Sequence, residues 1–276
     1  MIPQYLIYQW QKSVPWKYES QVEQDMVISR ALVELFKNPE IRENLAFRGG
    51  TALNKLFLTP AARYSEDLDF VQIKDEPIGK TLSHIRSVLD PWLGKARWDQ
   101  KERTAKLIYR FQSEDQPSKP MRLKIEINTI EPFSVYGYKF CDFSIISDWF
   151  SGEANIRTYE LEELMGTKLR ALYQRLKGRD LFDLWLGISK LKMNCPKVVH
   201  AFLKYNDHNK TRVTRSQLEE NIFHKLKDKT FISDIEALLP MNTTYDLQNA
   251  YLTIMNELIA LVPGEAWEGV NSSVYV

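Results

Sequence analysis

The chain has 276 residues, of which 44% are hydrophobic and 26% charged, and its formal net charge is +1 at pH 7. This composition is typical of a globular protein, and the length predicts two domains or one domain with an extension. The chain lacks a membrane-length apolar run and a signal-peptide pattern, so we expect a cytoplasmic protein with no membrane association. Its two cysteines and four histidines lack the spacing of a disulfide framework or a zinc site.

The first predicted elements surround a pair of glycines. An amphipathic pattern predicts a helix over residues 18–36, and apolar residues predict a short strand at 45–47. Gly49-Gly50 breaks this strand, and residues 51–57 have the composition of a helix start. A helix N-terminus beside a glycine turn presents free N–H groups and partial positive charge, which suit phosphate.

Two aspartates follow on a predicted strand. Polar and apolar residues alternate over 67–70, so the carboxylates of Asp67 and Asp69 share one face while Leu68 and Phe70 point to the core. Two carboxylates on one face suit Mg²⁺, which often binds one or two carboxylates together with substrate phosphates. The glycine turn and the aspartates together indicate metal-assisted chemistry on a nucleoside triphosphate.

A further acid lies on a predicted strand downstream. After a helix over 78–93, strands are predicted at 107–112 and 123–128, and the polar loop 113–120 joins them as a hairpin. Glu126 shares a face with Lys124 and Asn128. An ordinary half-solvated strand is the simpler interpretation, but the upstream motif favours a functional role for Glu126.

From residue 160 onward the pattern is helical. Lys168 falls on or beside an apolar stripe, where it either extends to water or neutralises phosphate charge in a cleft. Gly178 is expected to end that helix and Asp180 to cap the next one. Asp183 then lies in the first turn, so we favour Asp183 as a functional residue and Asp180 as a cap.

The segment 190–229 is basic, with ten Lys or Arg against four acids. Such a segment can attract the phosphates of RNA, and Tyr205 could stack on a base. A solvated basic loop without a ligand is an equally open interpretation. The candidate RNA contacts are Lys204, Lys210, Arg212 and Arg215.

The stretch FRGGTALNKLFLTPAARYSEDLDF, residues 47–70, resembles the nucleotidyltransferase signature of a glycine turn, a helix and Asp-x-Asp. More narrowly, it resembles the AbiEii/AbiGii toxin family (type IV toxin–antitoxin, MenT-like), whose members carry FxGGTxLxK, a loop, and R-[FY]-SED-[ILV]-D. The family's later helical lysine and RDxxDL run match Lys168 and residues 179–184. The resemblance implies an α+β fold, with a polymerase-β-like palm of mixed sheet and flanking helices over 1–158 and a helical region over 159–276.

The resemblance also implies roles for single residues. Asp67 and Asp69 would bind Mg²⁺ or Mn²⁺. Glu126 would be the third acid on a neighbouring strand, either as a further metal ligand or as the base that acts on the acceptor hydroxyl. Lys168 would contact the nucleotide phosphates. Asp183 or Asp180 would complete the pocket. The catalytic set is then Asp67, Asp69, Glu126, Lys168 and Asp183, and the nucleotide-binding set is Gly49, Gly50, Thr51, Lys55, Ser65, Lys168 and Asp180.

The implied function is a Mg²⁺-dependent nucleotidyltransferase toxin that moves a nucleoside monophosphate from an NTP to an acceptor and releases pyrophosphate. The acceptor is a tRNA 3′ end in some members, and the expected context is a toxin–antitoxin or phage-defence pair with a cognate antitoxin protein. One alternative is a small-molecule, antibiotic-type nucleotidyltransferase, which a carboxylate-rich acceptor pocket would favour. The other is a nucleotide- or partner-binding module without catalysis, against which the intact motif residues argue.

Overall fold

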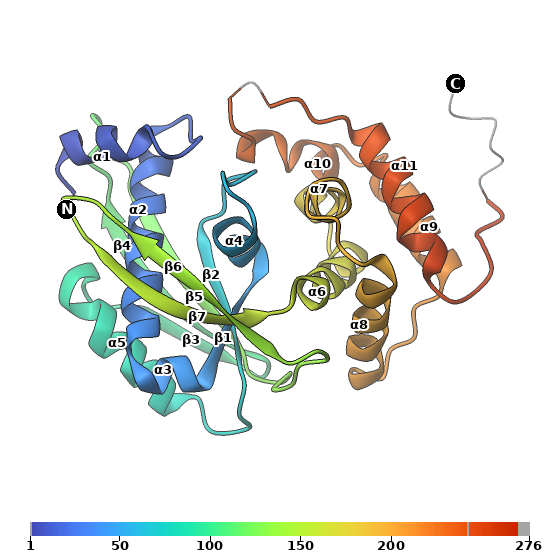
Figure 1. Cartoon of the computed structure of the whole chain (residues 1–276), viewed down its shortest axis with the longest axis horizontal. Helices are drawn as coiled ribbons and strands as arrows, with labels where there is room; N and C mark the ends of the chain where they lie inside the picture. The colour runs from blue at the N-terminus through green and yellow to red at the C-terminus, as the bar shows by residue number, and fades with distance from the viewer. Residues whose placement is uncertain (1, 242, 270–276) are drawn as a thin grey trace. The chain divides into compact units, whose positions relative to one another are not determined.

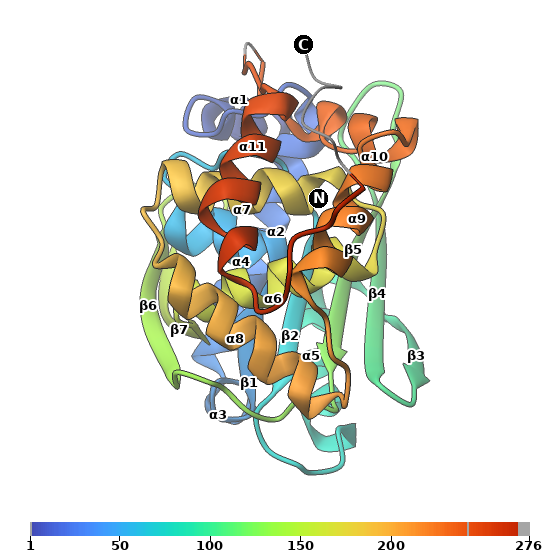
Figure 2. The same cartoon turned by 90° about the vertical axis from the view of Figure 1, so that its right-hand side faces the viewer.

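The structure is a computed structural model that describes residues 2–241 and 243–269. The chain divides into two compact units: residues 1–159 with 240–242, and residues 160–239 with 243–276 (Figures 1 and 2). Residues 270–276, the end of the predicted helical region, lie outside the described residues.

The first unit is built on a seven-stranded mixed sheet with the strand order β3-β4-β5-β2-β1-β7-β6 (Figure 1). The β2–β5 and β1–β7 pairs are parallel, and the other neighbours are antiparallel. The predicted α+β class, a mixed sheet with flanking helices, is confirmed. The strands are β1 Leu45–Arg48, β2 Asp67–Gln72, β3 Arg97–Lys101, β4 Thr104–Gln112, β5 Pro120–Asn128, β6 Tyr138–Ile145 and β7 Gly152–Tyr159.

Helices cover the apolar face of this sheet. The long helix α2 (Glu19–Lys37) packs across several strands, and the Phe36 and Phe70 rings lie 6.0 Å apart. Helix α5 (Gly79–Leu93) packs on β4, where the Tyr109 hydroxyl donates to Asp90 Oδ1 at 2.9 Å. Because side chains alternate along a strand, burying this face turns the polar residues of β2, β4 and β5 to the opposite face. Of two shorter helices, α3 (Pro39–Asn44) packs against β1, α2 and α5, and α1 (Gln4–Gln11) packs on α2.

The helix predicted over 51–57 begins two residues earlier than expected. Helix α4 (Gly49–Ala52) continues directly into a π-helical turn, Leu53–Phe57. Both glycines therefore form the first turn instead of preceding it. Gly49 has φ +83°, a backbone conformation that glycine adopts at no steric cost.

The second unit is helical throughout its described part. Its α-helices are α6 Leu161–Gln174, α7 Gly178–Ser189, α8 Cys195–His208, α9 Arg215–Lys225, α10 Lys229–Ser233 and α11 Leu247–Glu257. Short 3₁₀ turns lie at Glu236–Leu238 and Ile259–Leu261. Within the described ranges, no helix of either unit combines the length and apolar character needed to span a membrane.

The predicted hairpin is confirmed, since β4 and β5 pair antiparallel on either side of the 113–119 loop. The two edge strands of the sheet were not predicted. All five residues of β3 are exposed, and Ile145 is the single buried residue of β6. Edge strands with so few buried residues lack the apolar alternation by which a strand is recognised.

Two helices of the second unit meet at a glycine. A Cβ added to Gly166 of α6 would lie 2.8 Å from Ala201 Cβ and 3.0 Å from the backbone of α8. The helices therefore approach more closely there than any side chain on α6 would allow.

We expect Gly166→Ala to lower the free energy of unfolding by about 1–3 kcal/mol, because the new methyl group overpacks against the α8 backbone. The measurement is urea-induced unfolding followed by circular dichroism. Gly79→Ala at the start of α5 is the control, since no heavy atom lies within 4 Å of its added Cβ. That variant should stay within about 0.5 kcal/mol of wild type or be more stable. Equal effects of the two substitutions would contradict the close helix contact.

Candidate functional site

The parallel pairing of β2 with β5 brings three carboxylates together. In this register Asp67 lies opposite Lys124 and Asp69 lies opposite Glu126. Since alternate residues of a strand share a face, Asp67, Asp69 and Glu126 all project from the polar face of the sheet. The sequence-predicted acids thus lie on adjacent strands, within a few residues of one another.

Lysine ammonium groups contact these carboxylates. Lys124 Nζ lies 2.7 Å from Asp67 Oδ2 and 3.4 Å from Glu126 Oε2. Lys106 of β4 lies opposite Glu126 and approaches its Oε2 to 3.2 Å. The Lys124 side chain is 24% exposed, so its charge is only partly screened by water. Lys124 is therefore the cation that holds the two strands' carboxylates near each other.

Asp69 carries the clearest sign of excess negative charge. Burial raises the pKa of its carboxyl, and the neighbouring Asp67 and Glu126 raise it further, while Lys124 and Arg48 oppose the shift. A carboxylate is hard to keep ionised in such surroundings unless another cation comes close. The site therefore favours the approach of additional positive charge.

The donor set fits a divalent metal ion. As the side chains lie, no three carboxylate, imidazole or thiol groups in residues 2–241 and 243–269 converge as metal ligands. Instead, the Lys124 ammonium group contacts Asp67 Oδ2 and Glu126 Oε2, two oxygens that could otherwise bind a metal ion. However, Asp67 Oδ1 is buried without a hydrogen-bond partner. Carboxylate oxygens are the ligands that Mg²⁺ prefers, so a metal ion that displaces the ammonium would meet a suitable set in Asp67, Asp69 and Glu126.

The glycine turn touches the aspartates directly. A Cβ at Gly49 would collide with Asp69 Oδ2, and a Cβ at Gly50 would collide with the Arg63 guanidinium. Gly49, whose φ is +83°, therefore needs a residue without a side chain, whereas a side chain at position 50 would require the Arg63 guanidinium to shift. Gly49 and Gly50 place the first turn of α4 against the carboxylate strand.

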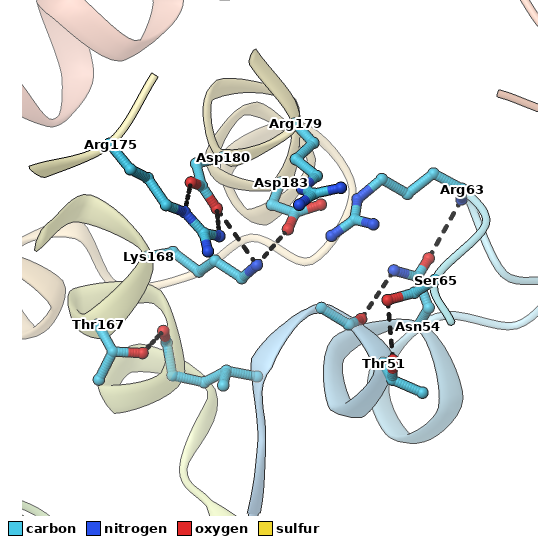
Figure 3. Close-up of polar contacts among 12 residues, drawn as sticks. Thr51, Asn54, Arg63, Ser65, Thr167, Lys168, Arg175, Arg179, Asp180 and Asp183 are labelled. Carbon is cyan, nitrogen blue, oxygen red and sulfur yellow. Dashed lines mark hydrogen bonds and ion pairs between the residues drawn. The ribbon is translucent and has the colours of Figure 1, made fainter. Parts of the chain in front are cut away.

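Hydroxyl and amide groups hold this arrangement in place (Figure 3). Thr51 Oγ1 donates to the Asp67 carbonyl at 2.5 Å and lies 2.8 Å from Ser65 Oγ. The Asn54 amide donates to the Gly50 carbonyl at 2.9 Å and accepts from the backbone N–H groups of residues 62 and 63. These bonds tie α4 to the segment that leads into β2. In this structure Thr51 and Ser65 support the site.

Lys55, predicted to bind nucleotide, points elsewhere. Its Nζ lies 2.7 Å from Asp25 Oδ1 and donates to Ser29 Oγ at 2.9 Å, both on α2. Asp25 also accepts from the Trp10 indole of α1 at 3.0 Å. The ammonium group of Lys55 therefore anchors the π-helical turn to α2, away from the carboxylate face.

The second unit contains a buried charge cluster between α6 and α7 (Figure 3). Lys168 Nζ lies 2.7 Å from Asp183 Oδ2 and 3.4 Å from Asp180 Oδ1. Arg175 forms a bidentate pair with Asp180 through Nε at 2.6 Å and Nη2 at 2.8 Å. Both aspartates are fully buried, and Lys168 is 4% exposed. The predicted residues of this unit thus form one contiguous ionic network.

The prediction that Asp180 caps α7 is wrong. The first helix ends at Gln174, Gly178 begins the second, and the N-cap residue is Lys177. Asp180 lies in the first helical turn and binds Lys168 and Arg175. Burial alone would raise the pKa of Asp180, but the two cations outweigh it and hold this pKa below its usual value.

The candidate RNA contacts in the basic segment of the second unit differ in their exposure and pairing. Lys204, Lys210 and Arg212 are exposed, whereas Arg215 pairs with Glu219 at 2.7 Å. The expectation that Tyr205 stacks on a base is wrong. Its side chain is fully buried on α8, and its hydroxyl donates to Glu163 Oε1 at 2.8 Å.

Several residues of the site were not predicted. Strand alternation placed Lys124 on the face of Glu126 but gave it no role, and Lys106 joins that face only through the β4–β5 register. Asn54 and Arg63 act through backbone contacts across a loop, for which no sequence spacing gives a signal. Arg48 pairs with the buried Glu131 at 3.6 Å, a contact that depends on the tertiary fold.

Comparison with known proteins relates the chain to nucleotidyltransferases. Residues 30–253 match the model of the family described as "Nucleotidyl transferase AbiEii toxin, Type IV TA system". The fold is similar to MenT4, a nucleotidyltransferase toxin of Mycobacterium tuberculosis H37Rv, with a TM-score of 0.68 and 18% identity over 95% of this chain and 90% of that one. It is also similar to a candidate nucleotidyltransferase from H. pylori, with a TM-score of 0.55 and 17% identity over 89% and 96% of the two chains. No curated protein matches the chain.

We expect Lys124→Met to lower the melting temperature in EDTA by about 2–6 °C, because the carboxylates lose their shared cation. This shift corresponds to a decrease in the free energy of unfolding on the order of 1–2 kcal/mol. Millimolar Mg²⁺ should restore most of the loss, since a metal ion that binds the folded state stabilises it. Differential scanning fluorimetry with and without Mg²⁺ tests this. Lys106→Met, which removes a cation from Glu126 alone, should give a smaller effect. A loss that Mg²⁺ leaves unchanged would contradict the metal fit.

We expect Lys168→Met to cost about 3–5 kcal/mol of unfolding free energy, because it leaves buried carboxylates without their ammonium partner. Adding Asp183→Asn should recover at least about 1 kcal/mol, since it removes one of these charges. Lys177→Met is the control; its side chain is 41% exposed, and it pairs with Asp234. It should cost less than about 1 kcal/mol. Urea unfolding is measured for these three variants and for Asp183→Asn alone, and strictly additive effects of the Lys168 and Asp183 substitutions would rule out the coupling.

Proposed function

The chain belongs to the AbiEii nucleotidyltransferase toxin family of type IV toxin–antitoxin systems, and from this premise we propose that it transfers a nucleoside monophosphate from an NTP to a tRNA 3′ end. Family membership makes the chain a nucleotidyltransferase. The proposal concerns the metal, the acceptor and the residues that act. Pyrophosphate is the leaving group.

One observation carries the proposal. The β2–β5 register sets Asp67, Asp69 and Glu126 on one sheet face, and Gly49 packs against Asp69 without room for a side chain. A backbone turn that presents N–H groups is thereby combined with three carboxylates. The first suits the oxygens of a triphosphate, and the second suits the cation that accompanies it.

Mg²⁺ or Mn²⁺, when bound by Asp67, Asp69 and Glu126, would neutralise charge on the triphosphate and on the leaving pyrophosphate. The α4 turn orients the triphosphate through its backbone N–H groups. Where Asp67 and Asp69 alone hold the metal, Glu126 accepts the proton of the attacking hydroxyl as the new phosphorus–oxygen bond forms and the bond to pyrophosphate breaks. Positioning and electrostatics supply most of the rate enhancement in transfers of this kind.

In the second unit, the nucleotide roles of Lys168, Asp180 and Asp183 remain part of the proposal. Lys168 is paired with two buried carboxylates, so a contact with phosphate requires it to exchange one of these partners. Lys204, Lys210 and Arg212 are exposed cations and stay candidate RNA contacts.

We also propose a cognate antitoxin protein as partner, because the family is described as part of type IV systems. Phage defence is a proposed context of the pair. Co-expression of the toxin with a gene from its own operon, scored by growth, would test the partnership.

We expect Asp67→Asn to lower transfer of labelled NMP to tRNA by at least about 10²-fold, because it removes a carboxylate charge from the metal-binding face. The assay incubates the protein with each α-³²P-labelled NTP, Mg²⁺ and total tRNA. Asp75→Asn is the matched control, since Asp75 is exposed in the loop after β2. Wild-type labelling of tRNA by Asp67→Asn would overturn the mechanism. Label transferred to small molecules but not to tRNA would favour the antibiotic-type enzyme.

A further inference from the structure

The first unit contains a hollow of about 790 Å³ at the end of the sheet where β5 begins and β4 ends. Its walls come from the start of α2, from the segment that leads into β2, and from the adjoining ends of β4 and β5. Glu66, which immediately precedes Asp67, lies in one wall. The hollow is therefore large enough for a nucleotide-sized group, and one of its walls continues along the chain into the carboxylate strand.

Two arginines in this wall lie directly opposite each other. Arg110 of β4 pairs in register with Arg122 of β5, and both side chains are exposed. Within the part of the chain that the structure describes, neither has an ion pair or a side-chain hydrogen bond. Like charges at directly opposed positions of an antiparallel pair are unfavourable. An anion bound between the guanidinium groups would remove this repulsion.

The other charged residues of the hollow do not neutralise the two arginines. Lys119 is paired with Asp115 at 2.7 Å, so it adds little net charge. Glu66 is exposed to solvent and is the acid among the lining residues. Two cations against one acid leave a net positive charge. Guanidinium groups bind phosphate oxygens in a bidentate manner, so the wall suits a phosphate group.

Strand alternation and strand order place the arginines relative to the chemistry. Arg122 shares a sheet face with Lys124 and Glu126. The glycine turn follows β1, on one side of β2, whereas β5 and β4 lie on the other side. The carboxylates of β2 thus separate the turn that suits a triphosphate from the arginine pair. In an in-line transfer, the attacking hydroxyl approaches from the side opposite the leaving group.

We propose that Arg110 and Arg122 bind backbone phosphates of the nucleic-acid acceptor near its reacting 3′ end. This assignment rests on the proposed function and specifies its acceptor site. Tyr18, at 51% exposure in the same hollow, offers a ring on which a terminal base stacks. The triphosphate is bound at the glycine turn, on the other side of the carboxylates.

The test is the binding of a 5′-fluorescein-labelled tRNA transcript, measured by fluorescence anisotropy without nucleotide over a range of salt concentrations. Arg110→Gln/Arg122→Gln should raise the Kd at least about 10-fold and reduce the slope of log K against log salt by about 1.4, the value for two single-strand phosphate contacts. The Kd for NTP, measured by calorimetry with Mg²⁺, should stay within about two-fold of wild type, since that site lies elsewhere.

The matched control is Arg42→Gln/Arg103→Gln, which removes two exposed arginines from α3 and from the β3–β4 turn. Arg103 lies seven residues from Arg110 along β4, roughly 23 Å at about 3.3 Å per residue. This control should bind tRNA as wild type does. A second comparison is Lys204→Gln/Lys210→Gln, from the basic segment of the second unit.

The assignment is overturned if wild type does not bind tRNA, if Arg110→Gln/Arg122→Gln binds it normally, or if the arginine change weakens NTP binding instead. It is also overturned if only the Lys204 and Lys210 substitutions reduce the salt slope. Failure of the proposed function has a different signature: arginine-dependent tRNA binding would persist although wild type labels no tRNA. Conversely, if the protein labels tRNA normally but the arginine substitutions do not change tRNA binding, the proposed function is retained and the arginine site is rejected.

Discussion

The register between β2 and β5 is the constraint on which the site depends. It sets Asp69 opposite Glu126 and Asp67 opposite Lys124. A shift of one residue in either strand would turn its polar residues toward the helices and its apolar residues toward solvent. The buried residues of these strands, Leu68 and Ile125 among them, therefore fix the positions of the carboxylates, because a one-residue shift would expose these apolar side chains to solvent. The packing of α2 and the geometry of the acids are consequences of the same pairing.

The two units balance charge in different ways. On the sheet, Lys124 and Lys106 contact carboxylates that remain partly open to water, and Asp69 still experiences excess negative charge. In the helical unit, Lys168 and Arg175 surround two aspartates that are fully buried. The first arrangement leaves the carboxylates accessible to a cation from solvent. In the second, any exchange of partners by Lys168 would leave a buried carboxylate without that ammonium group, which is costly.

The parts of the site that strand alternation governs could be predicted from the sequence. Asp67 and Asp69 share a face because a strand has a period of two, and Glu126 shares one with Lys124 for the same reason. The hairpin signal pairs β4 with β5, whereas the place of β5 beside β2 is a long-range contact that no local pattern gives. Contacts that depend on long-range packing could not be predicted, as Lys55 illustrates by reaching Asp25 on α2. The helix-end signals were also misleading. Gly178 begins α7, although glycine more often follows a helix, and Asp180 pairs with cations instead of capping that helix. Tyr205 looked like a surface aromatic but completes the core of its unit.

The close contact between Gly49 and Asp69 limits what the glycine turn can recognise. A surface made of backbone alone, without space for a side chain, presents the same N–H groups to every nucleotide. In its proposed role, such a turn would bind the triphosphate, which all four NTPs share, without distinguishing the base. A preference for one nucleotide would then depend on side chains outside the turn, so selectivity could change while the binding of the triphosphate stayed the same.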